Sequence, residues 1–242
     1  MVDTPLTSPL MVLTDSGGFY DFTSDLTMKD TAYTSLALGA HTDTTYFTDP
    51  AGLQMFHLLS HTDGAGGMSL LIDGFKAARD LKRMSGKSYE AMSRIPVPWH
   101  ASGNEGVTIT PAKGFPVLNF ADHYVEERNP RLLQVRWNND DRGVVGLRER
   151  DIMRADKWYT AARLWSDILK REDMQYWAQL EPGRPLSTSH SCLAFQTNDR
   201  VVFDNWRVLH GRSAFTGKRR ICGGYSESCK VGRRVERLLI HY

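Results

Sequence analysis

The sequence carries an imidazole and a carboxylate at a spacing that suits a metal ion. His41-Thr42-Asp43 places the two groups two residues apart. On an extended segment such residues point to the same face, so both could reach one metal. A second histidine from a distant strand would complete a facial set of two histidines and one carboxylate. That set leaves three positions open for substrate and dioxygen on Fe(II).

The same tripeptide occurs twice, so the pattern alone does not select a site. His61-Thr62-Asp63 runs straight into a glycine-rich turn, where Asp-Gly is ordinary turn chemistry. The copy at His41 instead follows an apolar run and has β-forming residues on both sides. We therefore predict that His41 and Asp43, rather than the second copy, bind the metal.

The third ligand is expected in Phe203-Asp-Asn-Trp-Arg-Val-Leu-His210-Gly-Arg. His210 ends an apolar run and meets glycine, a place where backbone can approach a ligand closely. The alternative is an ordinary core histidine. Farther along, Arg219 could hold a carboxylate of a bound organic acid through its bidentate guanidinium. The alternative for Lys218-Arg219-Arg220 is a solvated turn.

Short strands broken by Gly, Pro and Asp are the elements that must position these residues. They are expected at 53–59, 68–72, 117–120, 132–137, 200–203 and 221–225. Apolar residues recurring every three or four positions predict a helix over 151–170, with shorter helices at 75–84 and 231–240. The Ser/Thr-rich stretch 186–201 is expected to be a loop. This pattern favours an all-β sandwich or jelly roll with helices outside.

Composition bounds the class of protein. The 242 residues are 41% hydrophobic and 24% charged, which is typical of one globular domain. A net charge of +2 without long charge runs argues against nucleic-acid or membrane-surface binding. No apolar stretch is long enough to span a membrane, and no secretory signal or transit peptide is evident, so we predict a cytoplasmic protein. Three cysteines without a CxxC motif indicate thiols in a reducing compartment.

Several motifs occur in the order of a known family. They are His41-Thr-Asp, Gly66-Gly-Met-Ser69-Leu-Leu-Ile-Asp-Gly-Phe, Asn138-Asn-Asp-Asp-Arg and the segment ending His210-Gly-Arg. From about Gly17 to Tyr225 the chain resembles the γ-butyrobetaine/trimethyllysine dioxygenase family, Fe(II)- and 2-oxoglutarate-dependent oxygenases of carnitine biosynthesis. Asp30-Thr-Ala-Tyr33-Thr and Phe215-Thr-Gly-Lys-Arg-Arg are closer to its trimethyllysine branch. The resemblance implies a mainly β fold with flanking helices and a double-stranded β-helix (jelly-roll) core.

The resemblance also implies a role for each matching residue. His41, Asp43 and His210 match the iron ligands. Arg219 matches the arginine that pairs with the distal carboxylate of 2-oxoglutarate, and Ser69 matches a hydroxyl near it. The implied substrate-binding residues are Tyr20, Tyr33 and Tyr225 around the trimethylammonium group, Asp30 at the α-ammonium group, and Asn138 and Asn139 at the amino-acid end. A quaternary ammonium cannot donate a hydrogen bond, so aromatic faces suit it, although core packing is the alternative for each tyrosine.

The implied reaction is hydroxylation of Nε-trimethyllysine at C3, the first step of carnitine biosynthesis. Fe(II) is the implied metal, 2-oxoglutarate the co-substrate, ascorbate the reductant, and succinate and CO2 the co-products. The same chemistry on γ-butyrobetaine is the alternative, and Asp30 argues against it because γ-butyrobetaine lacks an α-ammonium group. A catalytically silent binding paralogue is a further alternative. A zinc hydrolase fits poorly, since no catalytic glutamate is evident beside the triad.

The sequence also departs from the family pattern. The chain begins near the catalytic core, so we expect one domain over 1–242 without the family's N-terminal domain, which is associated with dimer formation. A homodimer and a mitochondrial location therefore stay open as alternatives. The segment before Gly17 lacks an expected aromatic residue. The stretch 186–201 is expected to be an inserted loop, and a one-residue slip in the strand after it would turn His210 away.

Overall fold

The computed structural model describes residues 18–23, 34–101, 108–121, 131–145, 152–182, 194–197 and 200–226. Most described elements are strands, and every pairing between them is antiparallel. The strands are β1 (Gly18–Thr23), β2 (Leu38–His41), β3 (Leu53–Thr62), β4 (Ser69–Asp73), β5 (Leu118–Phe120), β6 (Leu132–Val135), β7 (Tyr176–Ala178), β8 (Ala194–Thr197), β9 (Arg200–Asp204), β10 (Val208–Arg212) and β11 (Lys218–Ser226).

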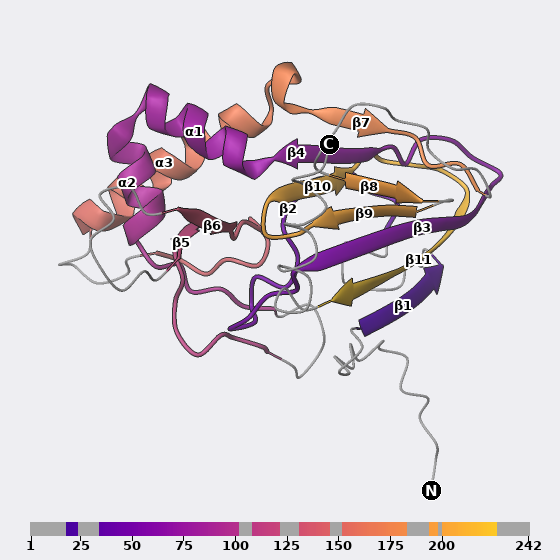
Figure 1. Ribbon diagram of the computed structural model, residues 1–242, viewed down its shortest axis with the longest axis horizontal. Helices are drawn as coiled ribbons and strands as arrows, with labels where there is room; N and C mark the ends of the chain where they lie inside the picture. The colour runs from indigo at the N-terminus through magenta and orange to yellow at the C-terminus, as the bar shows by residue number, and fades with distance from the viewer. Residues whose placement is uncertain are drawn as a thin grey trace, which may run out of the picture.

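Two sheets form the body of the protein (Figure 1). One has the order β1-β11-β3-β9-β8 and the other the order β2-β10-β4-β7, while β5 and β6 form a small third sheet. Side chains pack between the two large sheets, because the His210 ring on β10 lies 5.3 Å from Phe56 on β3 and 5.0 Å from Phe203 on β9. Two antiparallel sheets packed face to face with non-consecutive strands paired are a jelly roll.

Three α-helices gather at one end of the sheets (Figure 1). They are α1 (Gly74–Met84), α2 (Gly86–Arg94) and α3 (Ile152–Leu169), and a short 3-10 turn follows at Glu172–Met174. The Asp73 carboxylate accepts a hydrogen bond from Phe75 N at the start of α1. Ser85 ends α1 and caps α2 through its hydroxyl, which accepts from Ser88 N. This shared serine explains how two helices follow each other without a loop.

The predicted helix over 151–170 forms as α3. Trp158 and Trp165 are fully buried, whereas Ile152 is 59% exposed and Tyr159 faces partly outward. The helix packs against α2 and α1, and Trp165 contacts Trp137 edge to face at 6.4 Å. The largest hydrophobic cluster lies here, between the helices, the small sheet and the face of β4 and β10 that is turned away from the other large sheet. It supports the strand that carries His210.

The strands expected at 53–59, 68–72, 117–120, 132–137, 200–203 and 221–225 are all present, as is the helix expected at 75–84. The helix expected at 231–240 lies outside the described residues. The expectation of a loop over 186–201 is wrong where the structure describes that stretch. Residues 194–197 form β8, and β9 begins at residue 200. Within the described residues, no helix has the length and hydropathy needed to cross a membrane.

Asp73 joins helix α1 to the sheet and is expected to matter for stability. Its carboxylate caps α1 and forms a bidentate pair with Arg207 at 3.1 and 3.0 Å. Asp73→Ala should lower the free energy of unfolding by about 2–3 kcal/mol, through the lost cap and the partly buried arginine left unpaired. Asp73→Asn keeps a capping side chain and should cost about 1 kcal/mol. Urea unfolding followed by tryptophan fluorescence measures both.

The pH dependence of the free energy of unfolding shows whether the pair of Asp73 and Arg207 stabilises the fold. Burial raises the pKa of Asp73, but Arg207 outweighs it and holds the pKa below its ordinary value. The stabilisation is therefore full above the unfolded pKa of about 3.9 and disappears as the pH falls through the lower folded pKa. The difference in the free energy of unfolding between wild type and Asp73→Asn should therefore disappear as the pH falls through this range. A gap that is constant down to the acid transition would contradict the pairing. Asp156→Asn, at an exposed carboxylate of α3, is the control.

Candidate metal centre

Two histidines are brought together by strand pairing. His41 is the last residue of β2, and His210 lies in the middle of β10, directly opposite it in the antiparallel register. Residues opposite each other project to the same face, so the two imidazole rings lie 4.3 Å apart. His210 is buried, as is every residue of β10. The neighbouring Gly211 lets β10 approach β2, because a side chain there would meet the Leu38 carbonyl oxygen at 2.6 Å.

Asp43 reaches the histidines from a turn, which corrects the expectation of one extended segment. Strand β2 ends at His41, and Thr44 has a left-handed φ of 58°. Even so, Oδ1 of Asp43 lies 3.2 Å from Nε2 of His41 and 3.6 Å from Nε2 of His210. The candidate ligand atoms of all three residues lie within 4.8 Å of one another. The predicted triad thus converges, although by a different local geometry.

The two oxygens of Asp43 have different surroundings. Oδ1 faces both imidazoles, whereas Oδ2 accepts hydrogen bonds from the Tyr225 hydroxyl at 2.6 Å and from the Gln54 amide. Gln54 on β3 is only 1% exposed, and Tyr225 belongs to β11. Both donors come from the sheet opposite β2 and β10, so the triad lies between the two large sheets. With Oδ2 occupied, Oδ1 is the oxygen left to bind a metal.

The charges of the triad suit metal binding. Burial and the nearby His41 lower the pKa of His210 to about 3, so its imidazole is neutral and offers a lone pair. Burial favours the protonated form of Asp43, but His210, His41 and the Tyr225 hydrogen bond outweigh it and hold its pKa well below the usual range. Nδ1 of His41 lies 2.8 Å from the Gly39 carbonyl oxygen and donates to it, which leaves Nε2 facing Asp43.

The spacing of the three groups fits a small divalent ion. Two ligand atoms about 2.1 Å from one ion and at right angles to each other lie about 3.0 Å apart. The separations of 3.2 and 3.6 Å between Oδ1 and the two Nε2 atoms are close to that value. Two imidazoles and one carboxylate on a single face form the facial set that suits Fe(II) with open positions. The residues present therefore fit the metal that the sequence predicts.

Arg219 is a buried cation beside this site. It is 5% exposed, and its Nε has no hydrogen-bond partner among the described residues. Its guanidinium lies 5.5 Å from the Phe215 ring, whose other cationic neighbour is Arg212 at 4.8 Å. Arg212 is two residues beyond His210 on β10, opposite Ser69 of β4. Ser69 and Arg219 are thus both near Arg212, and Arg212 lies on β10, the strand that carries the metal ligand.

Two of the three predicted aromatic residues lie together at the site. Tyr20 on β1 and Tyr225 on β11 have ring centroids 5.4 Å apart. Tyr20 donates a hydrogen bond to the Met55 carbonyl oxygen, and Tyr225 donates to Asp43. Burial raises the pKa of both phenols, and Asp43 raises it further, so both hydroxyls stay protonated. Tyr33 lies outside the described residues.

The predicted polar substrate residues are less directly placed. Asn138 accepts from Asp140 N and donates to the Asp141 carboxylate, so its side chain closes its own turn. Asn139 accepts from Arg142 Nε and is exposed. The turn adjoins the triad through Asp141, which accepts a hydrogen bond from Thr45 Oγ1 at 3.2 Å. Asp30 is outside the described residues.

The second copy of the tripeptide ends β3 and runs into a turn, as expected. His61 is near the end of β3 and donates through Nε2 to the Thr216 carbonyl oxygen at 2.9 Å. Asp63 is exposed and has a left-handed φ of 58°. Among the described residues, the candidate metal cluster consists of His41, Asp43 and His210 only.

Sequence reasoning missed two residues that hold Asp43. Gln54 sits in an otherwise apolar strand, Leu-Gln-Met-Phe, and a polar residue at such a position is the signal that could have identified it. Asn205 is 1% exposed and hydrogen-bonds the backbone of Asp43 on both sides. It was part of the His210 motif, but its role depends on a contact across 162 residues.

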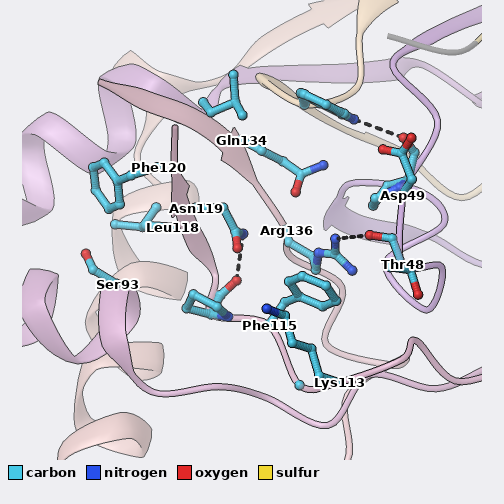
Figure 2. Close-up of a pocket in the computed structure, with 15 residues that line it drawn as sticks. Thr48, Asp49, Ser93, Lys113, Phe115, Leu118, Asn119, Phe120, Gln134 and Arg136 are labelled. Carbon is cyan, nitrogen blue, oxygen red and sulfur yellow. Dashed lines mark hydrogen bonds between the residues drawn. The ribbon is translucent and has the colours of Figure 1, made fainter. Parts of the chain in front are cut away.

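A separate pocket lies beyond the segment that follows Asp43. Figure 2 shows this cavity of about 470 Å³, which is lined by Phe115, Gln134 and Arg136 among others and by none of the triad. Arg136 donates to the carbonyl oxygens of Thr45, Phe47 and Thr48. The pocket wall thus fixes the segment after Asp43 from outside. Of the lining residues, Arg136 supports the segment that follows Asp43, and none belongs to the triad.

The fold and the triad define a class of protein. A jelly roll with two histidines on paired strands and an aspartate from the adjoining turn is the arrangement of non-haem iron oxygenases. The comparison with protein families agrees, because residues 13–186 and 191–225 match the model of the taurine catabolism dioxygenase TauD, TfdA family. The chain belongs to this family.

Relatives and solved structures refine the comparison. The trimethyllysine dioxygenase of Neurospora crassa is 50% identical, covering 88% of this chain and 47% of that protein. The mitochondrial trimethyllysine dioxygenase of Gallus gallus is 41% identical, with 86% and 45% covered, and human γ-butyrobetaine dioxygenase is 22% identical, with 90% and 51% covered. The chain spans about half the length of these relatives. An asparagine oxygenase structure matches with a TM-score of 0.60 at 14% identity, covering 89% of this chain and 60% of that one.

Proposed function

We propose that this chain is the catalytic part of an Fe(II)- and 2-oxoglutarate-dependent dioxygenase that hydroxylates Nε-trimethyllysine at C3. The observation that carries the proposal is the converged triad, with one oxygen of Asp43 facing both imidazoles at 3.2 and 3.6 Å. The 50% identity to a trimethyllysine dioxygenase supports the choice of substrate. The second candidate, γ-butyrobetaine, is supported by the weaker relative at 22% identity.

The chemistry itself comes from the bound metal and co-substrate. Fe(II) with 2-oxoglutarate and dioxygen supplies the oxidation that replaces a C–H bond by C–OH, while 2-oxoglutarate is converted to succinate and CO2. The two atoms of dioxygen are then accounted for, one in the alcohol and one in succinate. Ascorbate is the proposed reductant that keeps the iron ferrous.

The chain's own residues hold and orient the reactants. His41, Asp43 and His210 would hold the ion, and the side that they leave open would be available to the co-substrate and dioxygen. The buried guanidinium of Arg219, whose Nε has no hydrogen-bond partner among the described residues, is suited to a carboxylate, because an anion relieves the cost of burying a cation. We assign it the distal carboxylate of 2-oxoglutarate, with the Ser69 hydroxyl beside it.

The aromatic pair is suited to the substrate's cationic end. Tyr20 and Tyr225 are half-buried beside Asp43, with their rings tilted by 46° and 5.4 Å apart. A trimethylammonium group gains cation–π attraction from such rings without needing a hydrogen bond. We place Tyr33 with them and Asp30 at the α-ammonium group. Asn138 and Asn139 are proposed to reach the amino-acid end through the turn that Asp141 ties to Thr45.

Mass spectrometry of an aerobic reaction tests the proposal. The chain is given Fe(II), 2-oxoglutarate and ascorbate, with trimethyllysine and γ-butyrobetaine offered separately. We expect trimethyllysine to gain one oxygen, with one succinate formed for each product molecule. Oxygen on γ-butyrobetaine alone would keep the chemistry and overturn the substrate. No product from a folded preparation that binds Fe(II) and 2-oxoglutarate would favour the silent binding paralogue.

Assembly and location are proposed on weaker grounds. A homodimer follows only from the family resemblance, and analytical ultracentrifugation tests it. A cytoplasmic location is predicted from the sequence, while the name of the Gallus gallus relative supports the mitochondrial alternative. Localisation of a tagged full-length protein in its own cells decides between the two.

A further inference from the structure

The turn that carries Asp43 needs support from outside itself. Strand β2 ends two residues earlier, so no ladder of backbone hydrogen bonds fixes the direction of this side chain. The next residue, Thr44, has a φ of 58°, a conformation that costs free energy for a branched residue. A turn of this kind persists only where its surroundings determine it. The position of Asp43 in the triad therefore depends on what holds its backbone, in addition to the Gln54 and Tyr225 donors to its Oδ2.

The side chain of Asn205 holds that backbone on both sides. Oδ1 of Asn205 accepts from the backbone N–H of Asp43 at 2.8 Å, and Nδ2 donates to the Asp43 carbonyl oxygen at 3.1 Å. The same Nδ2 donates to the Ala51 carbonyl oxygen at 2.9 Å. Asn205 thus satisfies both backbone groups of Asp43, as a neighbouring strand would do in a sheet.

Asn205 is itself rigidly held. It is 1% exposed, and its own N–H donates to the Gly52 carbonyl oxygen at 2.8 Å. It lies in the tight connection between β9 and β10, where the Asp204 carboxylate accepts from Trp206 N. Five residues farther along the chain, β10 carries His210. One connection therefore supplies a metal ligand and also the side chain that orients a second ligand from a distant turn.

We propose that Asn205 is a positioning residue for the metal centre, acting through the backbone of Asp43. It aims Oδ1 of Asp43 at the two imidazoles before any metal binds, so the ion meets a preformed site. This inference rests on the proposed function only in identifying the triad as a metal site. Its test therefore uses metal binding rather than turnover.

The first experiment compares Asn205→Ala with Asn119→Ala. Asn119 makes one side-chain hydrogen bond, to the Pro116 carbonyl oxygen, and lies on β5 away from the triad. Binding of Mn(II) alone is measured by electron paramagnetic resonance. We expect Asn205→Ala to weaken Mn(II) binding about 10–100-fold, as loss of a group supporting a metal ligand does, and Asn119→Ala to leave it unchanged. Affinity within about 2-fold of wild type in folded Asn205→Ala would overturn the proposal.

Thermal unfolding separates a positioning role from a merely structural one. A structural role lowers the melting temperature equally with and without Mn(II). A positioning role also shrinks the rise in melting temperature that Mn(II) produces, because that rise depends on the affinity for the metal. An undiminished rise in Asn205→Ala would count against the proposal.

A measurement on the wild-type chain covers the case in which Asn205→Ala does not fold. In the metal-free protein, the Asp43 amide should exchange its hydrogen more than about 100-fold slower than the amide of Asp140, which is bonded in an exposed turn. Equal rates would show that Asn205 does not hold the turn. If the wild type binds Mn(II) yet hydroxylates neither substrate, the proposed function fails and this inference stands. If it binds no Mn(II), both fail.

Discussion

Asp43→Ala is expected to abolish hydroxylation and to weaken Fe(II) binding by more than about 100-fold. Loss of a group that merely supports a metal ligand costs about 10–100-fold, so loss of the ligand itself should exceed this range. Asp43 is also the only carboxylate of the triad, and it stands between two imidazoles at 3.2 and 3.6 Å. Without it, only two imidazoles are left to hold a divalent cation. Calorimetric titration with Fe(II) under anaerobic conditions and succinate release measure the two effects.

The repeated tripeptide supplies the matched control. Asp63 stands in the same His-Thr-Asp sequence, but it is exposed in a turn with a left-handed φ. Asp63→Asn suits that backbone, since asparagine tolerates this conformation, and it should leave metal binding and turnover unchanged. Equal losses in the two variants would mean that the effect comes from the tripeptide's charge and not from the site. Full activity of Asp43→Ala would refute the ligand assignment.

The strands and helices with strong local patterns could be predicted from the sequence. Alternating and apolar runs located β3, β4, β9 and β11, and helical periodicity located α1 and α3. Strand β2 is four residues long and β7 three, too short for a periodic pattern. Helix α2 begins with glycine and depends on the Ser85 cap it shares with the end of α1. Residues 194–197 are a strand because β9 lies beside them, which is a tertiary fact rather than a local one.

The candidate site shows the same division. The types of His41, Asp43 and His210 made the triad predictable, and the pairing of β2 with β10 brings it together. The extended geometry assumed for His41 and Asp43 was wrong, because the chain turns at Thr44. What compensates for that turn comes from residues far away in sequence, Asn205 and Gln54. Such contacts leave only a weak trace in one sequence, a buried polar residue within an apolar run.

The chemistry of the site also changes how Tyr225 is understood. The sequence predicted it as an aromatic surface for the substrate, and its ring lies 5.4 Å from that of Tyr20 at a tilt of 46°. Its hydroxyl, however, donates to Oδ2 of Asp43. The ring and the hydroxyl therefore point to two functions in one residue, one toward the substrate and one toward the metal ligand. Tyr225→Phe would separate them, because it keeps the ring and removes the donor.

Arg219→Ala is expected to raise the KM for 2-oxoglutarate by about 100-fold or more, with a smaller effect on the KM for the substrate. A guanidinium that holds a carboxylate through two charge-assisted hydrogen bonds contributes about 3 kcal/mol or more, and every 1.4 kcal/mol is a factor of ten. Burial and the charge of Arg212 lower the pKa of Arg219 to about 10, so it stays charged at neutral pH and gains from an anion. Arg219→Lys keeps the charge but loses the bidentate guanidinium. Its KM for 2-oxoglutarate should therefore lie between the values of wild type and Arg219→Ala.

The adjacent residue is the control for this prediction. Arg220 follows Arg219 on β11 and so points to the other face of the strand, where it pairs with Asp21 in solvent. Removing it changes the net charge by the same amount, and exposed ion pairs contribute little. Arg220→Ala should therefore leave the KM for 2-oxoglutarate within about 2-fold of wild type. If the two alanine variants raise the KM for 2-oxoglutarate equally, Arg219 acts only through the overall positive charge of the protein. The buried guanidinium is then not the partner of the carboxylate.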